Sequence, residues 1–129
     1  TNSAVQTINR IINVFPADRQ TQIRTMLSFV LQGVVSQQLI PKTYEKGRVA
    51  ALEVMIPSPG IRNLIREDKL HQVYSQMQIG QETSGMITMN QSLKRFVETG
   101  TLSQDVAMAH STVPEELANM FGRTNKKGS

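Results

Sequence analysis

The sequence has 129 residues, of which 39% are hydrophobic and 19% charged, a composition typical of a globular domain with a core. It contains no cysteine, which excludes disulfides and thiolate metal sites, and no apolar run is long enough to span a membrane. The net charge is +4, but the basic residues are scattered, and with four Phe, two Tyr and no Trp there is no aromatic platform for stacking bases. We therefore expect no nucleic-acid partner and no direct membrane insertion.

Apolar residues at helical spacing predict two helices at the start of the chain. Ser3 can cap a first helix that ends near Asn13, just before a Phe-Pro pair. A second, longer helix is expected over about residues 17–37. Gly33 would lie inside it, at a cost of about 1 kcal/mol relative to Ala, which suggests close packing at that position.

A short β-hairpin is expected over about residues 38–56. Residues 38–43 have extended character, 44–47 have the composition of a turn, and 48–56 are the best strand in the chain. Both faces of that strand are largely apolar, which predicts that both are covered. Glu53 is the exception, and we expect its carboxylate to have a structural partner.

The segment after the hairpin predicts a short helix with a clear start. Ser58 is a suitable N-cap, and Pro59 suits the first turn because it lacks the N–H that would be unpaired there. The helix would carry an apolar stripe and two polar flanks: Ile61, Leu64 and Ile65 on the stripe, Arg62 and Arg66 on one flank, and Asn63 and Glu67 on the other. On spacing alone, this is a surface helix docked by three aliphatic side chains.

The two arginines of this helix need partners if they are buried. A buried guanidinium requires a carboxylate or a carbonyl, and Glu53 and Glu67 are the candidates for pairing with Arg62 or Arg66.

Further helices are expected in the rest of the chain. Asp68 can cap a helix over residues 69–79, which Gly80 would end. We expect residues 1–122 to form a single domain and residues 123–129 to form a flexible tail.

The last three helices also have recognisable boundaries. Thr88 or Asn90 is expected to cap a helix that Gly100 ends. Ser103 would cap the next helix, and Pro114 would open a final short one.

The motifs of a complete catalyst are missing from these residues. There is no G-x-x-x-x-G-K-[ST] loop for phosphates and no nucleophile elbow, and His71 and His110 have no partner at metal-ligand spacing. By its own residues the chain is not a complete enzyme.

The string Ile61–Glu67 closely resembles the AIRNLIRE motif of the type IV pilus retraction ATPases, the PilT family, with Gly60 in place of the motif's Ala. Residues Thr1–Ala4 are similar to the continuation of the His box of secretion-type ATPases, the HTN-S-A run, whose His would lie just before Thr1. Other matches to family segments are Asn9–Pro16, Gln22–Arg24, Leu31–Leu39, Gly47–Glu53 and Gly85–Leu93. The resemblance covers most of residues 1–121.

The resemblance implies an α/β fold, the C-terminal portion of a RecA-like P-loop ATPase core, mostly helical, with the hairpin and a C-terminal helical appendix. The parent would be a cytoplasmic homohexamer at the inner face of the bacterial inner membrane. It would use ATP and Mg²⁺ to retract pili together with the inner-membrane platform protein and the pilin machinery. Walker A, Walker B and the catalytic Glu would precede Thr1, so the chain alone is expected to be inactive and to bind no cofactor.

The resemblance also assigns roles to particular residues. Thr1 and Asn2 would lie beside the nucleotide site, next to the His box. The aliphatic residues of the motif helix would dock it. Its polar residues would make the contacts that couple ATP-driven domain movement to retraction.

Two other interpretations stay open. Pilus-assembly and type II secretion ATPases share a similar strand and a related helix, but they typically carry a four-cysteine zinc insertion. Here the corresponding interval, Ile40–Lys46, is short and has no Cys, which favours the retraction branch. The third interpretation is a stand-alone helical adaptor that binds a partner protein through the face of Arg62 and Arg66.

Overall fold

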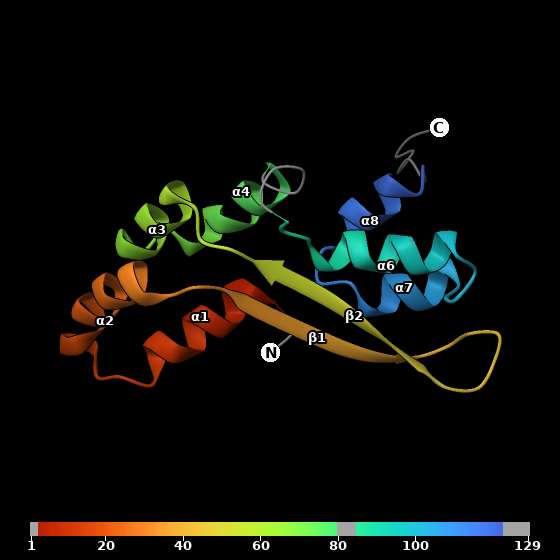
Figure 1. Cartoon of the computed structure of the whole chain (residues 1–129), viewed down its shortest axis with the longest axis horizontal. Helices are drawn as coiled ribbons and strands as arrows, with labels where there is room; N and C mark the ends of the chain where they lie inside the picture. Colours follow the sequence, from red (N-terminus) through yellow and green to blue (C-terminus); the bar gives the residue numbers. More distant parts are fainter. Residues whose placement is uncertain (1–2, 80–84, 123–129) are drawn as a thin grey trace, which may run out of the picture. The chain divides into compact units, whose positions relative to one another are not determined.

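A computed structural model describes residues 3–79 and 85–122 of the chain. The chain divides into two compact units: the first is Thr1–Gln37 with Leu52–Thr88, and the second is Gln38–Ala51 with Met89–Ser129. The expected single domain over 1–122 stays a prediction, and the expected tail lies outside the described residues. Figure 1 labels the elements that follow.

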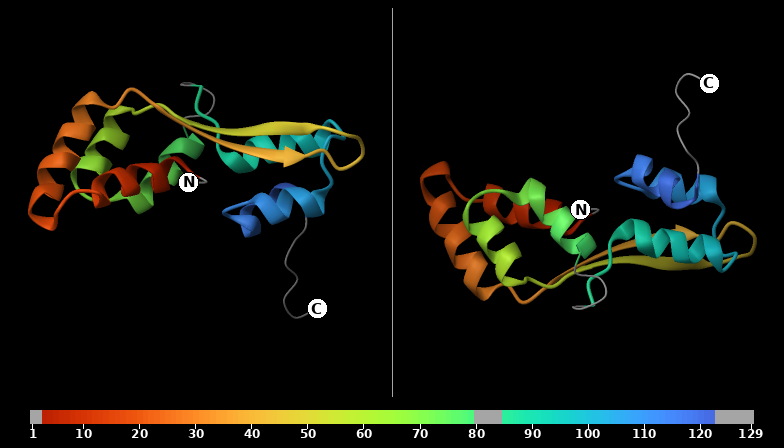
Figure 2. Two further views of the ribbon diagram at one scale, coloured as in Figure 1. Left: turned by 90° about the horizontal axis from the view of Figure 1, so that it is seen from below. Right: turned by 90° about the horizontal axis from the view of Figure 1, so that it is seen from above.

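Strands β1 (Val34–Pro41) and β2 (Arg48–Met55) form a two-stranded antiparallel hairpin, visible in Figures 1 and 2. The hairpin is confirmed, but β1 begins at Val34 rather than near residue 38. One face of β2 is buried at Ala51, Glu53 and Met55, whereas the other face is exposed at Ala50 and half-buried at Leu52 and Val54. Within the described residues the second face of β2 is only partly covered, so the prediction that both faces are covered is wrong.

Helix α1 (Ala4–Asn13) confirms the first predicted helix. The Ser3 hydroxyl accepts a hydrogen bond from the Gln6 N–H at 3.1 Å, as an N-cap should. Three residues four apart face the core of the first unit: Ala4, Ile8 and Ile12. The start of the helix and its apolar face therefore follow from local sequence.

Glu53 has the structural partner that the sequence predicted. Its carboxylate, 1% exposed on β2, accepts a hydrogen bond from the Ala4 N–H at 2.8 Å. A negative charge is favourable at a helix N-terminus, where backbone N–H groups have no partner within the helix. Glu53 thus ties β2 to the start of α1.

Helix α2 (Ala17–Val30) ends well before residue 37, so that prediction is wrong. At Leu31 the backbone turns to the extended region, with ψ at 123°, and the chain enters β1. The physical reason is pairing with β2, a long-range interaction that overrides helix propensity. Gly33 is therefore not inside a helix, although it does lie close to another backbone: an added Cβ would stand 3.4 Å from the Met55 carbonyl oxygen.

The first unit also contains α3 (Pro59–Arg66), the 3₁₀ turn η1 (Leu70–Gln72) and α4 (Val73–Ile79). In the views of Figure 2, α2 and α3 lie side by side. Buried side chains from the helices, β1 and β2 form one core: Ala4, Ile8, Ile12, Val34, Met55, Ile61, Ile65, Leu70, Val73, Met77 and Met86. A bridge from Val54 to Ile87 adds two backbone hydrogen bonds, of 2.8 and 3.1 Å.

Asp68 does not cap the helix that follows it, contrary to prediction. Its φ is +60°, in the left-handed region, and it reverses the chain after α3. The N–H of Lys69 then donates to the Leu64 carbonyl at 2.8 Å, which closes the C-terminus of α3. The next helical turn starts as a 3₁₀ turn at Leu70, and Gly80, the predicted end of α4, lies outside the described residues.

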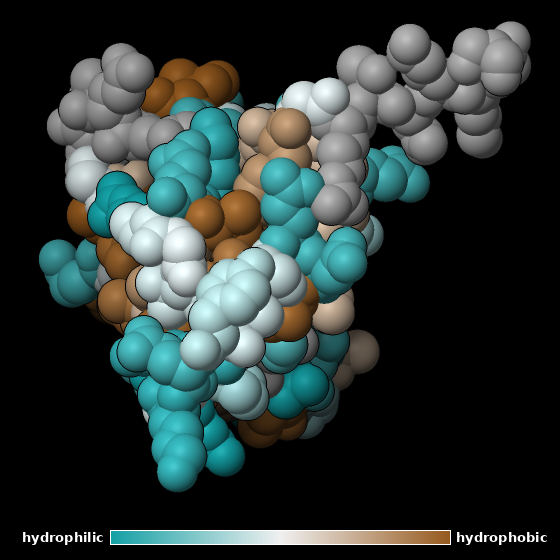
Figure 3. Space-filling view, turned by 90° about the vertical axis from the view of Figure 1, so that its right-hand side faces the viewer, coloured by the Kyte–Doolittle hydropathy of each residue, from teal (hydrophilic) through white to brown (hydrophobic). Residues whose placement is uncertain are grey.

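The second unit packs α6 (Met89–Glu98), α7 (Gln104–His110) and α8 (Pro114–Met120) around a core of its own. That core consists of Ile40, Ala51, Met89, Leu93, Leu102, Ala107 and Leu117. Figure 3 shows polar side chains over most of the face at the right of Figure 1, with apolar ones scattered among them. This is the pattern of an ordinary solvated surface.

The predicted boundaries of the last helices are largely confirmed. Gly100, with φ at +76°, ends α6, and the Thr101 N–H donates to the Phe96 carbonyl at 2.8 Å. The Ser103 hydroxyl caps α7 by accepting from the Val106 N–H at 3.1 Å.

Asn90 is not a cap, because it lies within α6 and is 2% exposed. Its amide nitrogen donates to the Val113 carbonyl and to the Glu116 carboxylate, both at 3.0 Å. Its amide oxygen accepts from the Ser111 hydroxyl at 2.5 Å. The side chain therefore fastens the start of α8 to α6, and Thr88 is the residue that directly precedes α6.

Candidate functional site

The motif helix α3 begins as the sequence predicts. The Ser58 hydroxyl accepts a hydrogen bond from the Ile61 N–H at 3.2 Å, and Pro59 occupies the first turn. Both devices reduce the number of unpaired N–H groups at the start of the helix. The position of the motif is thus fixed at its first turn by local chemistry.

The apolar stripe of α3 docks it onto the core of the first unit. Ile61 and Ile65 are both fully buried, and Leu64 is partly buried at the edge of the same core. Burial of each isoleucine is worth about 1.5–3 kcal/mol. The stripe therefore has two anchors and one flanking contact, and the remaining motif side chains are free to face outward.

Arg62 attaches α3 to the end of α2. Its Nη1 donates to the Ser28 carbonyl at 3.0 Å and to the Phe29 carbonyl at 3.5 Å. These carbonyls belong to the last turn of α2, where they have no helical partner and where a positive charge is favourable. A carbonyl partner was one of the two kinds predicted for this arginine.

The two carboxylates named as candidate partners are engaged elsewhere. Glu53 accepts from the Ala4 N–H, and Glu67 forms an ion pair with Lys69 at 3.3 Å. Among the described residues, these two candidate carboxylates have other partners, and Arg62 takes the carbonyl alternative.

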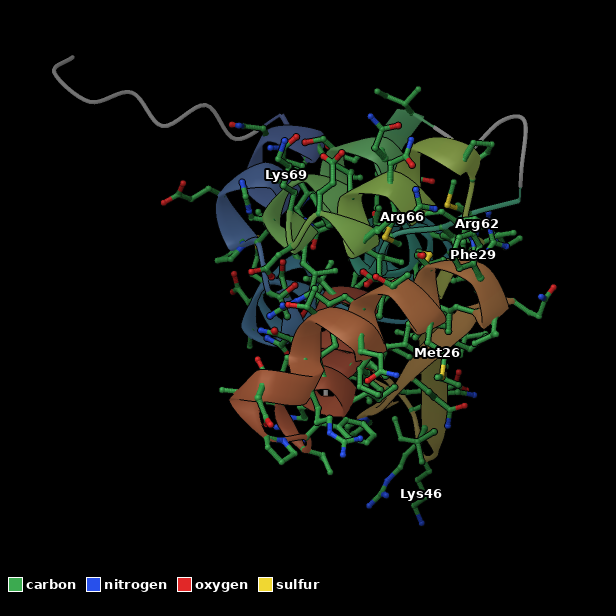
Figure 4. The ribbon with its side chains drawn as sticks, turned by 90° about the vertical axis from the view of Figure 1, so that its left-hand side faces the viewer. Met26, Phe29, Lys46, Arg62, Arg66 and Lys69 are labelled. Carbon is green, nitrogen blue, oxygen red and sulfur yellow. The ribbon has the colours of Figure 1, made fainter. Side chains whose placement is uncertain are left out.

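Arg66 makes three contacts, two of them with the last turn of α2 and one with Asn63 on its own helix. Its Nε donates to the Ser28 hydroxyl at 3.3 Å, its Nη1 donates to the Asn63 side-chain oxygen at 3.1 Å, and its guanidinium carbon lies 4.9 Å from the centre of the Phe29 ring. The last contact is a cation–π interaction. Figure 4 shows Arg62, Arg66 and Phe29 close together on this side of the molecule.

Ser28 is the hub of this arrangement, and sequence reasoning missed it. It is fully buried; its hydroxyl donates to the Thr25 carbonyl at 2.6 Å and accepts from Arg66. Its carbonyl accepts from Arg62. Ser28 occupies an ordinary polar position on α2, so no local signal in the sequence distinguishes it.

A second link between the two helices is an ion pair, also missed from the sequence. Arg24 Nε lies 3.3 Å from an Asp68 carboxylate oxygen, with side chains 17% and 65% exposed. Arg24 Nε is buried and has no aligned hydrogen-bond acceptor within the described residues, so the attraction is one of charge rather than a directed hydrogen bond. A partly exposed pair of this kind contributes about 0–1 kcal/mol.

The other predicted site residues, Thr1 and Asn2, lie outside the described residues. No group of three or more potential metal-binding side chains occurs in the part of the chain that the structure describes. Among those same residues, no helix is both long and apolar enough to cross a membrane. The site that the structure brings together is therefore the motif helix with the last turns of α2.

Known proteins resemble the chain along nearly its whole length, although no family model matches it. It is 49% identical over 117 residues to the type IV pilus retraction ATPase PilT of Pseudomonas aeruginosa, covering 91% of this chain and 33% of that protein. It is 42% identical over 118 residues to the twitching motility protein of Neisseria gonorrhoeae, covering 92% and 31%. A crystal structure of the pilus retraction motor PilT with bound ADP has a TM-score of 0.80 and 48% identity, covering 93% of this chain and 33% of that chain.

The fold of the chain matches that of the C-terminal portion of the PilT structure. More specifically, the chain is homologous to the PilT-family ATPases and corresponds to their C-terminal part, as the AIRNLIRE-like string predicted. It spans about a third of the length of the relatives that it matches.

Proposed function

We propose that the complete protein carrying this chain is an ATP-hydrolysing motor that retracts type IV pili in twitching motility. The observation that supports this most is the 49% identity to a pilus retraction ATPase over 91% of the chain. The chain would form the C-terminal part of the motor. ATP with Mg²⁺ would bind residues that the chain does not contain, with Thr1 and Asn2 next to that site.

The proposal includes the assembly in which the motor would work. The complete protein would be a homohexamer in the cytoplasm, at the inner face of the inner membrane, and its partners would be the platform protein and the pilin machinery. The proposal is supported by the similarity to a type IV pilus retraction ATPase and to a twitching motility protein.

The mounting of α3 suggests how the motif would couple ATP turnover to retraction. Two isoleucines and Arg62 join α3 to the core and to α2, so a force on the outer side of α3 acts on the whole first unit. Arg62, Asn63, Arg66 and Glu67 would make the coupling contacts, and the last three are exposed. Retraction should therefore fall much more than ATP hydrolysis when Arg66 is replaced by Ala in the complete protein.

A nucleotide-binding comparison tests the proposal directly. Calorimetry with ATP and Mg²⁺ should show no binding to this 129-residue chain, whereas the complete protein should bind and hydrolyse ATP. Absence of ATPase activity in the complete protein would overturn the motor and leave the adaptor interpretation. Tight binding by the chain alone would show that the nucleotide site has been placed wrongly.

Complementation separates retraction from assembly. In a strain that lacks its retraction ATPase, the complete protein should restore twitching, and Arg66→Ala should not. Restored pilus formation in a strain that lacks its assembly ATPase, without restored twitching, would instead favour a pilus-assembly or secretion motor.

A further inference from the structure

Helix α2 exposes an apolar stripe near its C-terminus. Met26, Phe29 and Val30 are 51%, 65% and 58% exposed, and their spacing of three and four residues puts them on one side of the helix. Single exposed apolar residues are normal, but three adjacent large ones that include Met and an aromatic ring have the composition of an interface. The stripe therefore requires an explanation beyond the fold.

Two guanidinium groups border this stripe. Arg66 stacks on the Phe29 ring, and Arg62 reaches the Phe29 carbonyl. Their hydrogen-bond partners among the residues that the structure describes are all neutral: backbone carbonyls, a hydroxyl and a side-chain amide. In the described ranges, the nearby carboxylates of Glu67 and Asp68 form ion pairs with other cations, Lys69 and Arg24.

The arrangement is held in place before any partner binds. Nη1 and Nε of Arg66 are fixed by Asn63 and Ser28, and Arg62 is fixed by the last turn of α2. A preorganised arginine loses less conformational entropy when a partner binds, and an arginine beside an exposed aromatic ring is a common composition for a binding hot spot. Figure 4 shows Met26, Phe29, Arg62 and Arg66 on one side of the molecule.

We propose that this Arg–Phe surface, defined as Met26, Phe29, Val30, Arg62 and Arg66, docks an acidic amphipathic helix of a protein partner. The partner's apolar side chains would pack on the α2 stripe, because residues spaced three and four apart on one helix match the same spacing on another. Its carboxylates, on the flank of that apolar face, would bind the two guanidinium groups, whose forked geometry suits carboxylates. The inference deepens the proposed function by giving the chemistry of the partner that the motif would contact.

Charge and composition favour a protein over a membrane surface. Binding to anionic lipid typically depends on a cluster of about 4–8 basic residues. The Arg–Phe surface contains two basic residues and three apolar ones, which is closer to a protein interface. A lipid headgroup would also leave the α2 stripe without a matching apolar helix.

A peptide-binding experiment tests the proposal. The probe is a fluorescein-labelled synthetic helix with a leucine stripe flanked by glutamates four residues apart, together with the same peptide in which lysines replace the glutamates. Fluorescence anisotropy with the complete protein should show binding of the acidic peptide and much weaker binding of the basic one. Arg66→Glu should weaken binding of the acidic peptide by at least about tenfold.

Matched variants separate docking from loss of folding. Met26→Glu changes an exposed side chain that holds neither arginine, and it should also weaken binding of the acidic peptide. The double variant Arg62→Glu with Arg66→Glu should bind the basic peptide instead. Arg19→Glu, at an exposed position in the first turns of α2, and Val14→Glu, at a residue 80% exposed, should leave binding of the acidic peptide unchanged.

Each remaining outcome overturns the proposal. Equal binding of both peptides, or binding unaffected by Arg66→Glu and Met26→Glu, would exclude an acidic helix as the occupant. Binding to vesicles of phosphatidylcholine with phosphatidylglycerol, lost in the same variants and without peptide binding, would identify a headgroup site. Self-association lost in those variants would identify a second copy. ATPase activity of the complete protein, measured in parallel, tests the proposed function separately.

Discussion

Two residues show most clearly how a side chain joins segments that are far apart in the sequence. Glu53 on β2 binds the first N–H of α1, and Arg62 on α3 binds the last carbonyls of α2. In each case a charged side chain pairs with backbone groups at a helix end that have no partner within the helix. The helix ends of the first unit therefore depend on residues outside those helices.

Glu53 should be important for stability as a hydrogen-bond acceptor. Glu53→Ala leaves the Ala4 N–H buried without its carboxylate and opens a cavity, and we expect the free energy of unfolding to fall by about 2–4 kcal/mol. Glu53→Gln keeps an acceptor oxygen of the same size and should lose about 1 kcal/mol. Urea unfolding followed by circular dichroism measures both. Equal losses in the two variants would mean that the hydrogen bond to Ala4 is not the important contact.

Asp68 should be sensitive to backbone conformation rather than to charge. Its φ of +60° is unfavourable for most residues, so Asp68→Ala should lower the free energy of unfolding by about 1–2 kcal/mol. Asp68→Gly also removes the ion pair with Arg24, yet it should stay within about 1 kcal/mol of the original because glycine accepts this conformation. Thermal unfolding distinguishes the two. A glycine variant as unstable as the alanine variant would show that the ion pair dominates.

At the scale of elements, most helix starts and the β-hairpin were predictable, whereas the point at which α2 ends and β1 begins was not. Ser3, Ser58 and Ser103 each cap the helix that the sequence assigns to them, because a cap depends only on residues within one turn. The end of α2 has no such signal. Apolar residues continue at helical spacing into β1, so the helix was predicted to extend too far.

The candidate site was also predictable only in part: its local features followed from the sequence, and its contacts with other elements did not. The buried stripe of α3 follows from the spacing of its isoleucines. The partners of its arginines are groups on α2, brought near by packing, and a local pattern cannot specify them.

The docking of α3 can be measured one side chain at a time. Ile65→Ala removes a fully buried side chain and should cost about 2–5 kcal/mol, whereas Leu64→Ala, at the edge of the core, should cost about 1–2 kcal/mol. Asn63→Ala, an exposed change on the same helix, should cost about 0.5 kcal/mol or less. Chemical denaturation gives all three values. Equal losses for Ile65→Ala and Asn63→Ala would mean that α3 is not docked by its apolar stripe.

At the scale of the whole molecule, residues 3–79 and 85–122 form two cores that share no residue. Each core is built from its own helices and from its own part of the hairpin. This division could not be predicted from the sequence, because no Gly-, Pro- or Ser-rich linker separates the units. The boundary between the units falls within β1 and within β2, and the sequence of each strand does not change in character at that point.

Because the two cores share no residue, we predict that a destabilising substitution in one core lowers the stability of its own unit more than that of the other. Leu93→Ala removes a fully buried side chain from the core of the second unit, and Ile8→Ala does the same in the first. Hydrogen exchange should show that Leu93→Ala lowers the protection of α6, α7 and α8 by about 2–4 kcal/mol and that of α1 and α3 by much less. Ile8→Ala should give the reverse pattern. If either variant instead lowers protection equally in both sets of helices, the two cores unfold together, and residues 1–122 behave as the single cooperative domain that the sequence predicted.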